Sequence, residues 1–121
     1  DLHLSLRRQR QMCIRDRVVH TLTKFKSEGK IGGFGFSEIS PSSLRRAHAV
    51  SPITAVQNEY SLWTRYPDLG MLQTCLELGV CFVPFAPLGR GMLTDTFPNP
   101  SNFKETDTRK KNPRFLEPNF S

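Results

Sequence analysis

The 121-residue chain contains few cysteines, and their spacing supports neither a metal site nor a disulfide framework. Cys13, Cys75 and Cys81 are odd in number and show no CxxC or Cys/His pattern. We therefore expect no metal, and we expect the thiols of Cys75 and Cys81 to be buried and unreactive. No apolar stretch approaches the roughly eighteen residues of a membrane span, and no signal-peptide core is present. These features predict a cytoplasmic protein without a membrane partner.

Basic residues outnumber acidic ones, and the resulting net charge of +6 is unevenly distributed along the chain. Residues 1–17 contain five arginines against two aspartates, which supplies half of that charge, and they show no helical or strand period. This segment could be a solvated tail or a basic arm that contacts phosphates. We favour a third interpretation, because SLRRQRQMCIRD resembles a translated sequencing adapter. We predict a foreign or disordered extension over residues 1–17, a folded domain over residues 18–121, and no nucleic-acid partner.

The segment from Gly79 to Gly91, GVCFVPFAPLGRG, has the pattern of a strand that leads into a binding loop. Its apolar run, residues 80–83, is too short for a helix and does not alternate, which predicts a parallel strand covered on both faces. The following turn, residues 87–91, is rich in proline and glycine and can bring the backbone close to a ligand.

Three helices are expected before this segment. The first runs from Val18 to Gly29, where apolar residues recur at helical spacing and glycine provides a stop. The Ser-Pro pair at residues 40–41 supplies an N-cap and a first-turn proline for the second helix. The third begins at the Pro-Asp pair of residues 67–68. Its expected buried stripe consists of Leu69, Leu72, Cys75 and Leu76.

Strands are expected to start at residues 31, 53 and 80, each after a helix. This serial pattern predicts an α/β fold with three parallel strands and covering helices, either doubly wound or closed as a barrel. The glycine-rich run IGGFGF at residues 31–36 lacks the GxGxxG order and does not open into a helix, so we reject a dinucleotide fingerprint there. Small residues where a neighbouring backbone or a ligand crowds the strand are the favoured explanation. The polar, proline-containing residues 94–121 are expected to be irregular.

Polar side chains follow the expected strands at the points where the strands end. Ser37 and Glu38 follow the first strand, Gln57 and Asn58 the second, and the turn over residues 85–90 the third. Each could be a simple strand-end cap. Because the carboxyl ends of parallel strands meet at the edge that carries ligand sites, three in succession predict such a site.

Three segments, GKIGGFGFSE, AVQNEYSLWTR and FVPFAPLGRGMLT, are similar in order and spacing to aldo-keto reductases. Members of this family are (β/α)8 barrels that reduce carbonyl compounds with NADPH. The similarity covers Val18 to Ser121. These residues resemble strands five to seven of the family's barrel and the loop that follows them. It implies a partial (β/α)8 TIM barrel truncated at both ends, an NADP-dependent oxidoreductase with NAD as the alternative cofactor, and a small carbonyl substrate.

The resemblance also implies seven cofactor-binding positions: Ser37, Glu38, Gln57, Phe85, Leu88, Gly89 and Arg90. Ser37 and Gln57 match residues that contact the nicotinamide carboxamide, and Phe85 matches an aromatic residue that stacks on the ring.

The turn that contains Leu88, Gly89 and Arg90 matches the one that covers the pyrophosphate, where N–H groups and a guanidinium suit anionic oxygens. Glu38 stands where many members have asparagine.

The family's catalytic aspartate, tyrosine, lysine and histidine lie on earlier strands, so no catalytic residue is assigned to this chain. We expect the 121-residue chain alone to be inactive. Two other functions stay open: a non-catalytic, cofactor-binding regulatory subunit of the same barrel family, and a nucleic-acid-binding module that uses the N-terminal arginines.

Overall fold

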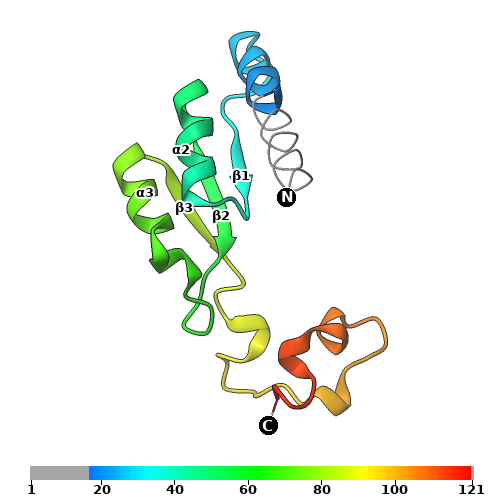
Figure 1. Cartoon of the computed structure of the whole chain (residues 1–121). Coiled ribbons are helices and arrows are strands. Elements are labelled where there is room, and N and C mark those ends of the chain that lie inside the picture. Colours follow the sequence, from blue (N-terminus) through cyan, green and yellow to red (C-terminus); the bar gives the residue numbers. More distant parts are fainter. Residues whose placement is uncertain (1–16, 121) are drawn as a thin grey trace, which may run out of the picture.

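The computed structural model describes residues 17–120, in which parallel strands, helices and an irregular C-terminal segment follow one another (Figure 1). Residues 17–27 form the first helix. The later elements are β1 (Gly35–Ser37), α2 (Pro41–Val50), β2 (Ala55–Glu59), α3 (Met71–Leu78) and β3 (Cys81–Phe85). The extension predicted for residues 1–17 lies outside the described residues, except for Arg17, which lies in the first helix.

The three strands are parallel and adjacent in sequence order, which confirms the predicted α/β arrangement. In this register Ser37 lies opposite Gln57, and Gln57 lies opposite Val83. Each strand begins slightly later than the sequence pattern suggests. The observed starts are Gly35, Ala55 and Cys81.

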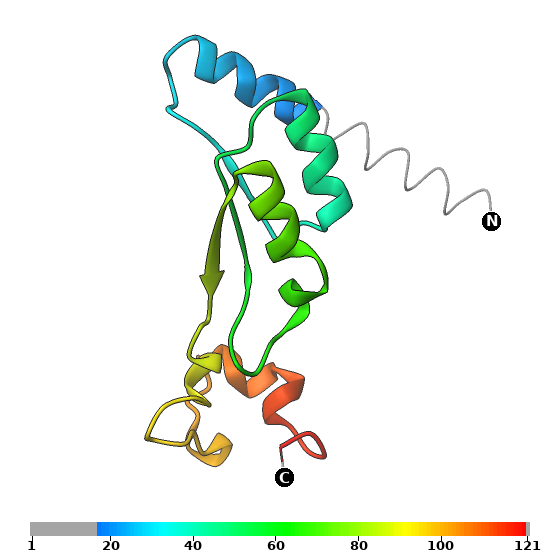
Figure 2. The ribbon, with the colours of Figure 1, turned by 90° about the vertical axis from the view of Figure 1, so that its left-hand side faces the viewer.

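One face of the sheet packs against helices and the other does not. Figures 1 and 2 show α2 and α3 on the same side of the strands. Val56 points to that side and is fully buried, whereas Gln57, Cys81 and Val83 on the opposite face are exposed. The prediction that residues 80–83 are covered on both faces is therefore wrong for the described chain. The prediction of a buried thiol holds for Cys75 and is wrong for Cys81, because Cys81 projects from this bare face.

The hydrophobic core lies between the helices and the covered face of the sheet. Its buried members come from the first helix, α2, α3, the strands and the segments that precede them: Val19, Phe34, Ile39, Leu44, Ala47, Ile53, Val56, Met71, Cys75 and Val80. Burial of this apolar surface is the main term that stabilises the unit.

The ends of the helices follow the expected capping chemistry. The hydroxyl oxygen of Ser40 accepts a hydrogen bond from the N–H of Ser43 at 3.3 Å, and Pro41 occupies the first turn of α2. Gly79 ends α3 with φ 64°, and the N–H of Val80 donates to the carbonyl of Cys75 at 2.9 Å.

The third helix begins later than predicted. Residues Tyr66–Leu69 form a separate 3-10 turn, and Gly70, with φ 122°, breaks the chain before α3 starts at Met71. The buried side of the helix also differs from the predicted one. Met71, Thr74 and Cys75 are buried, whereas Leu69 and Leu76 are 82% and 79% exposed, so the predicted stripe is wrong for those two leucines.

Glycine at position 35 is required by the close approach of two strands. A Cβ atom at Gly35 would lie 2.4 Å from the carbonyl oxygen of Ala55, a backbone atom that cannot move without disturbing β2. This confirms that small residues in this run accommodate neighbouring backbone.

We expect Gly35→Ala to lower the free energy of unfolding by about 1–3 kcal/mol, the usual effect of overpacking. The control is Gly32→Ala, since a Cβ atom at Gly32 would meet nothing within 4 Å. It should change stability by no more than about 0.5 kcal/mol. Denaturant unfolding of both variants checks this, and equal effects would contradict the steric account.

Residues 94–120 are irregular, as predicted, but they are organised around one buried ring. Three short 3-10 helices, Pro100–Asn102, Thr108–Lys111 and Pro113–Phe115, lie beyond the carboxyl ends of the strands (Figure 2). Phe115 is 2% exposed. Its ring centroid lies 5.5–5.9 Å from those of three other aromatic residues: Trp63, Phe103 and Phe120.

Candidate functional site

Ser37 and Gln57 lie side by side on the bare face of the sheet. They are directly paired in the β1–β2 register, and both side chains are exposed. Within residues 17–120, neither side chain makes a hydrogen bond. Two neutral groups that can donate and accept are thus presented together and unused, which suits a neutral amide ligand.

Glu38 adopts a backbone conformation that glutamate rarely takes. Its φ is 50°, in the left-handed region that asparagine and glycine tolerate better. The N–H of Glu38 donates to the carbonyl of Gln57 at 3.0 Å, and its Oε1 accepts from the N–H of Glu59 at 2.7 Å. The side chain is therefore used to join β1 to the end of β2.

Phe85 ends β3 on the same face as Gln57. It pairs with Glu59 in the β2–β3 register, and its carbonyl accepts from the N–H of Tyr60 at 3.2 Å. The side chain of Phe85 is half-buried, which leaves part of the ring surface available to a planar ligand. The structure thus brings Ser37, Gln57 and Phe85 to one face.

Asn58 is the strand-end residue that the structure separates from this group. It alternates with Gln57 along β2 and points to the helix side, where its Nδ2 donates to the carbonyl of Ile39 at 3.2 Å. Its Oδ1 is buried and has no partner within the described residues. Asn58 lines a cavity of about 320 Å³ between the strand ends and the loop over residues 64–71.

The turn after β3, which we call the β3 turn and define as residues 86–91, has an unusual backbone. Left-handed φ values occur at Ala86 (49°), Gly89 (58°), Arg90 (58°) and Gly91 (101°). Two N–H groups are engaged inside the turn: that of Gly89 donates to the carbonyl of Ala86 at 2.9 Å, and that of Gly91 donates to the carbonyl of Leu88 at 3.1 Å. Gly89 also fits a tight space, because a Cβ atom there would lie 3.2 Å from the ring of Trp63.

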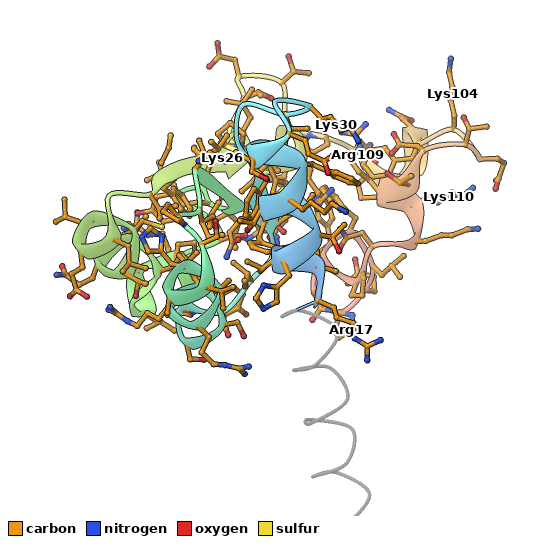
Figure 3. The ribbon with its side chains drawn as sticks, turned by 90° about the horizontal axis from the view of Figure 1, so that it is seen from above. Arg17, Lys26, Lys30, Lys104, Arg109 and Lys110 are labelled. Atoms are coloured by element: carbon orange, nitrogen blue, oxygen red, sulfur yellow. The ribbon has the colours of Figure 1, made fainter. Side chains whose placement is uncertain are left out.

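Arg90 is held at two points. Its guanidinium Nη2 lies 3.6 Å from Oε2 of Glu59, and its carbonyl accepts from Nη1 of Arg109 at 3.1 Å. Figure 3 shows Arg109 pointing back into the fold, whereas Lys104 and Lys110 point away from it. Nε of Arg90 is buried and has no hydrogen-bond partner within the described residues.

Glu59 lies at the centre of a cluster of side chains that the sequence pattern does not indicate. Its Oε1 accepts from Nη1 of Arg114 at 2.8 Å and from the hydroxyl of Thr64 at 3.2 Å, and its Oε2 faces Arg90. Burial raises the pKa of Glu59, but the hydrogen bond and charge of Arg114, with smaller effects of Thr64 and Arg90, outweigh burial and lower it. Because Arg114 lies 55 residues further along the chain, no local pattern could have indicated this cluster.

Within residues 17–120, no group of three or more histidine, cysteine or acidic side chains is arranged to hold a metal ion. None of the helices in that range has the length and apolar character needed to cross a membrane.

The fold defines the chain as part of an α/β protein, a class in which ligand sites lie at the carboxyl ends of parallel strands. A model of the aldo/keto reductase family matches residues 8–119, and the chain belongs to this family. The match includes part of the N-terminal segment over residues 1–17.

Known relatives agree with this assignment. The chain is 42% identical over 108 residues to the aldo-keto reductase yakc of Schizosaccharomyces pombe, whose name carries NADP(+), with 87% of this chain and 32% of the relative covered. It is 44% identical over 106 residues to the aldo-keto reductase str7 of Strobilurus tenacellus, with 85% and 32% covered. The chain thus spans about a third of the length of these relatives.

A solved structure agrees with the fold. The glycerol dehydrogenase of Gluconobacter oxydans superimposes with a TM-score of 0.76 at 27% identity, covering 88% of this chain and 32% of that protein. The resemblance to an aldo-keto reductase and the partial-barrel fold class are confirmed. The cofactor roles of the seven positions stay predictions.

Proposed function

We propose that this chain is part of an NADP-dependent oxidoreductase that reduces aldehydes or ketones to alcohols. It would contribute part of the nicotinamide and pyrophosphate site. The observation that carries this proposal is the placement of Ser37, Gln57 and Phe85 on one face, with the β3 turn directly after Phe85. NADP is the favoured cofactor because a relative's name carries it, and NAD is the alternative.

The residues present fit this cofactor. Ser37 and Gln57 offer unused neutral groups for the carboxamide, and Phe85 offers an aromatic surface for the ring. In the β3 turn, Leu88, Gly89 and Arg90 would lie along the pyrophosphate. The unpartnered Nε of Arg90 supports an anionic ligand there.

Glu38 would act on the cofactor only indirectly, because its carboxylate is engaged by the N–H of Glu59. The bound dinucleotide would supply the hydride for carbonyl reduction. The role of this chain would be to bind the nicotinamide and fix which ring face meets the substrate.

We further propose that residues 18–121 are part of a longer barrel. The chain spans about a third of its relatives' length, and the outer edges of β1 and β3 have no strand partner within the described residues. The bare face of the sheet would then become part of the barrel interior. The foreign or disordered character of residues 1–17 and the cytoplasmic location stay predictions.

Phe85 provides the test of the proposed cofactor site. In the full-length protein, Phe85→Ala should weaken NADPH binding by roughly two- to tenfold, because stacking area is lost. Phe85→Tyr should keep the affinity, since it keeps the ring. Titration by quenching of protein fluorescence checks this.

Phe25→Ala is the control, because Phe25 is an exposed aromatic residue on the first helix, outside the site. Equal NADPH affinity of the wild type and both Phe85 variants would remove Phe85 from the site.

A further inference from the structure

We propose that Glu59 is a positioning residue of the cofactor site. Its carboxylate holds Arg90, and with it the β3 turn, in the conformation that receives the pyrophosphate. This inference rests on the proposed function of the turn. It assigns a role to a residue outside the seven predicted positions.

The carboxylate of Glu59 is itself fixed from several sides. Oε1 is bound by Arg114 at 2.8 Å and by Thr64 at 3.2 Å, and the N–H of Glu59 is bound by Glu38. The side chain is only 18% exposed, so water competes little for these contacts. Oε2 is thereby held in a constant position toward Arg90.

Arg90 needs such support because its backbone is strained. A non-glycine residue with φ 58° and ψ 30° is disfavoured unless the surroundings maintain it. Arg109 holds its carbonyl, and Glu59 lies beside its guanidinium. With Nη2 directed to Glu59, the buried Nε remains unpaired and could donate to an anionic oxygen.

The charges in this cluster predict whether loss of the Glu59 carboxylate tightens or weakens cofactor binding. Glu59 is the carboxylate that faces both Arg90 and Arg114, so Glu59→Gln leaves two guanidiniums without their shared counter-charge. If long-range charge dominated, the more positive variant would bind an anionic cofactor more tightly. If positioning dominates, as we propose, the loosened turn binds it more weakly.

The test uses the full-length protein and two readouts. Glu59→Gln should raise the Kd for NADPH about fivefold or more. It should also increase hydrogen exchange at residues 86–93 in the cofactor-free protein. Glu77→Gln is the matched control, because Glu77 also pairs with an arginine, Arg45, but lies on α3 away from the turn. It should change neither readout.

A variant pair separates positioning from general stability. In an Arg90→Gln background, Glu59→Gln should change the Kd by less than about twofold, since its proposed target is already absent. If Glu59→Gln does not fold, Arg90→Gln alone should still raise exchange at residues 86–93.

Failure of the wild type to bind NADPH would overturn the proposed function and, with it, this inference. Wild-type binding that is unchanged or tightened in Glu59→Gln, or unchanged exchange at the turn, would overturn the inference alone.

Discussion

Truncation of Leu44 to alanine is expected to destabilise the protein by about 2–5 kcal/mol, the range for a large aliphatic side chain removed from a core. Leu44 is fully buried on α2, and the side chains around it come from several elements of the core cluster. A loss of this size is a large share of the roughly 5–15 kcal/mol that stabilises a typical domain. Thermal or denaturant unfolding of the full-length protein would measure it.

Leu76→Ala is the control for this prediction. Its helical spacing alone suggested a buried position, but the structure leaves Leu76 79% exposed. Removing an exposed side chain should change stability by no more than about 0.5 kcal/mol. A Leu76→Ala variant as unstable as Leu44→Ala would show that α3 packs on the face suggested by the sequence and not on the one described.

Local chemistry explains which parts of the fold were predictable. Ser40 and Gly79 mark helix ends through their own backbone and side-chain preferences, and the structure confirms both. Leu69 was misplaced because Gly70 breaks the chain before α3, so that the spacing of Leu69 does not continue into the helix. Leu76 lies within α3, and helical spacing alone did not show that the side with Met71 and Cys75 is the one that packs. Exposure of Cys81 was missed because an apolar run does not reveal how many layers cover a strand.

In the candidate site, too, some features could be predicted from local sequence and others could not. The strand-end positions of Ser37, Gln57 and Phe85 follow from the serial order of helices and strands. Two sequence neighbours behave differently for reasons of geometry: Asn58 alternates to the helix side, and Glu38 is engaged with the end of β2. The cluster around Glu59 depends on long-range contacts that no motif encodes.

The 121-residue chain is expected to be inactive on its own. Expressed alone, it should not reduce aldehydes, because a barrel of this type needs roughly 250 residues and eight strands. The described residues supply three strands, with unpaired outer edges and an exposed face that carries Cys81 and Val83. Unpaired edges and apolar surface favour aggregation, so partial folding is the physical expectation.

Catalysis gives an independent reason for this inactivity. Hydride transfer needs a general acid held in register with the cofactor, and we assign no such residue to this chain. Enzyme-like turnover by residues 1–121, abolished by Gln57→Ala or Phe85→Ala, would show that the chain holds a catalytic set of its own.

Carbonyl reduction with NADPH can be measured as the aldehyde-dependent loss of NADPH absorbance. The assay compares the full-length protein, residues 1–121 alone and buffer. We predict loss of absorbance with a small aldehyde for the full-length protein and a rate equal to buffer for residues 1–121. A full-length protein that binds NADPH but does not oxidise it when any aldehyde or ketone is added would contradict the proposal. It would indicate a non-catalytic, cofactor-binding member of the family.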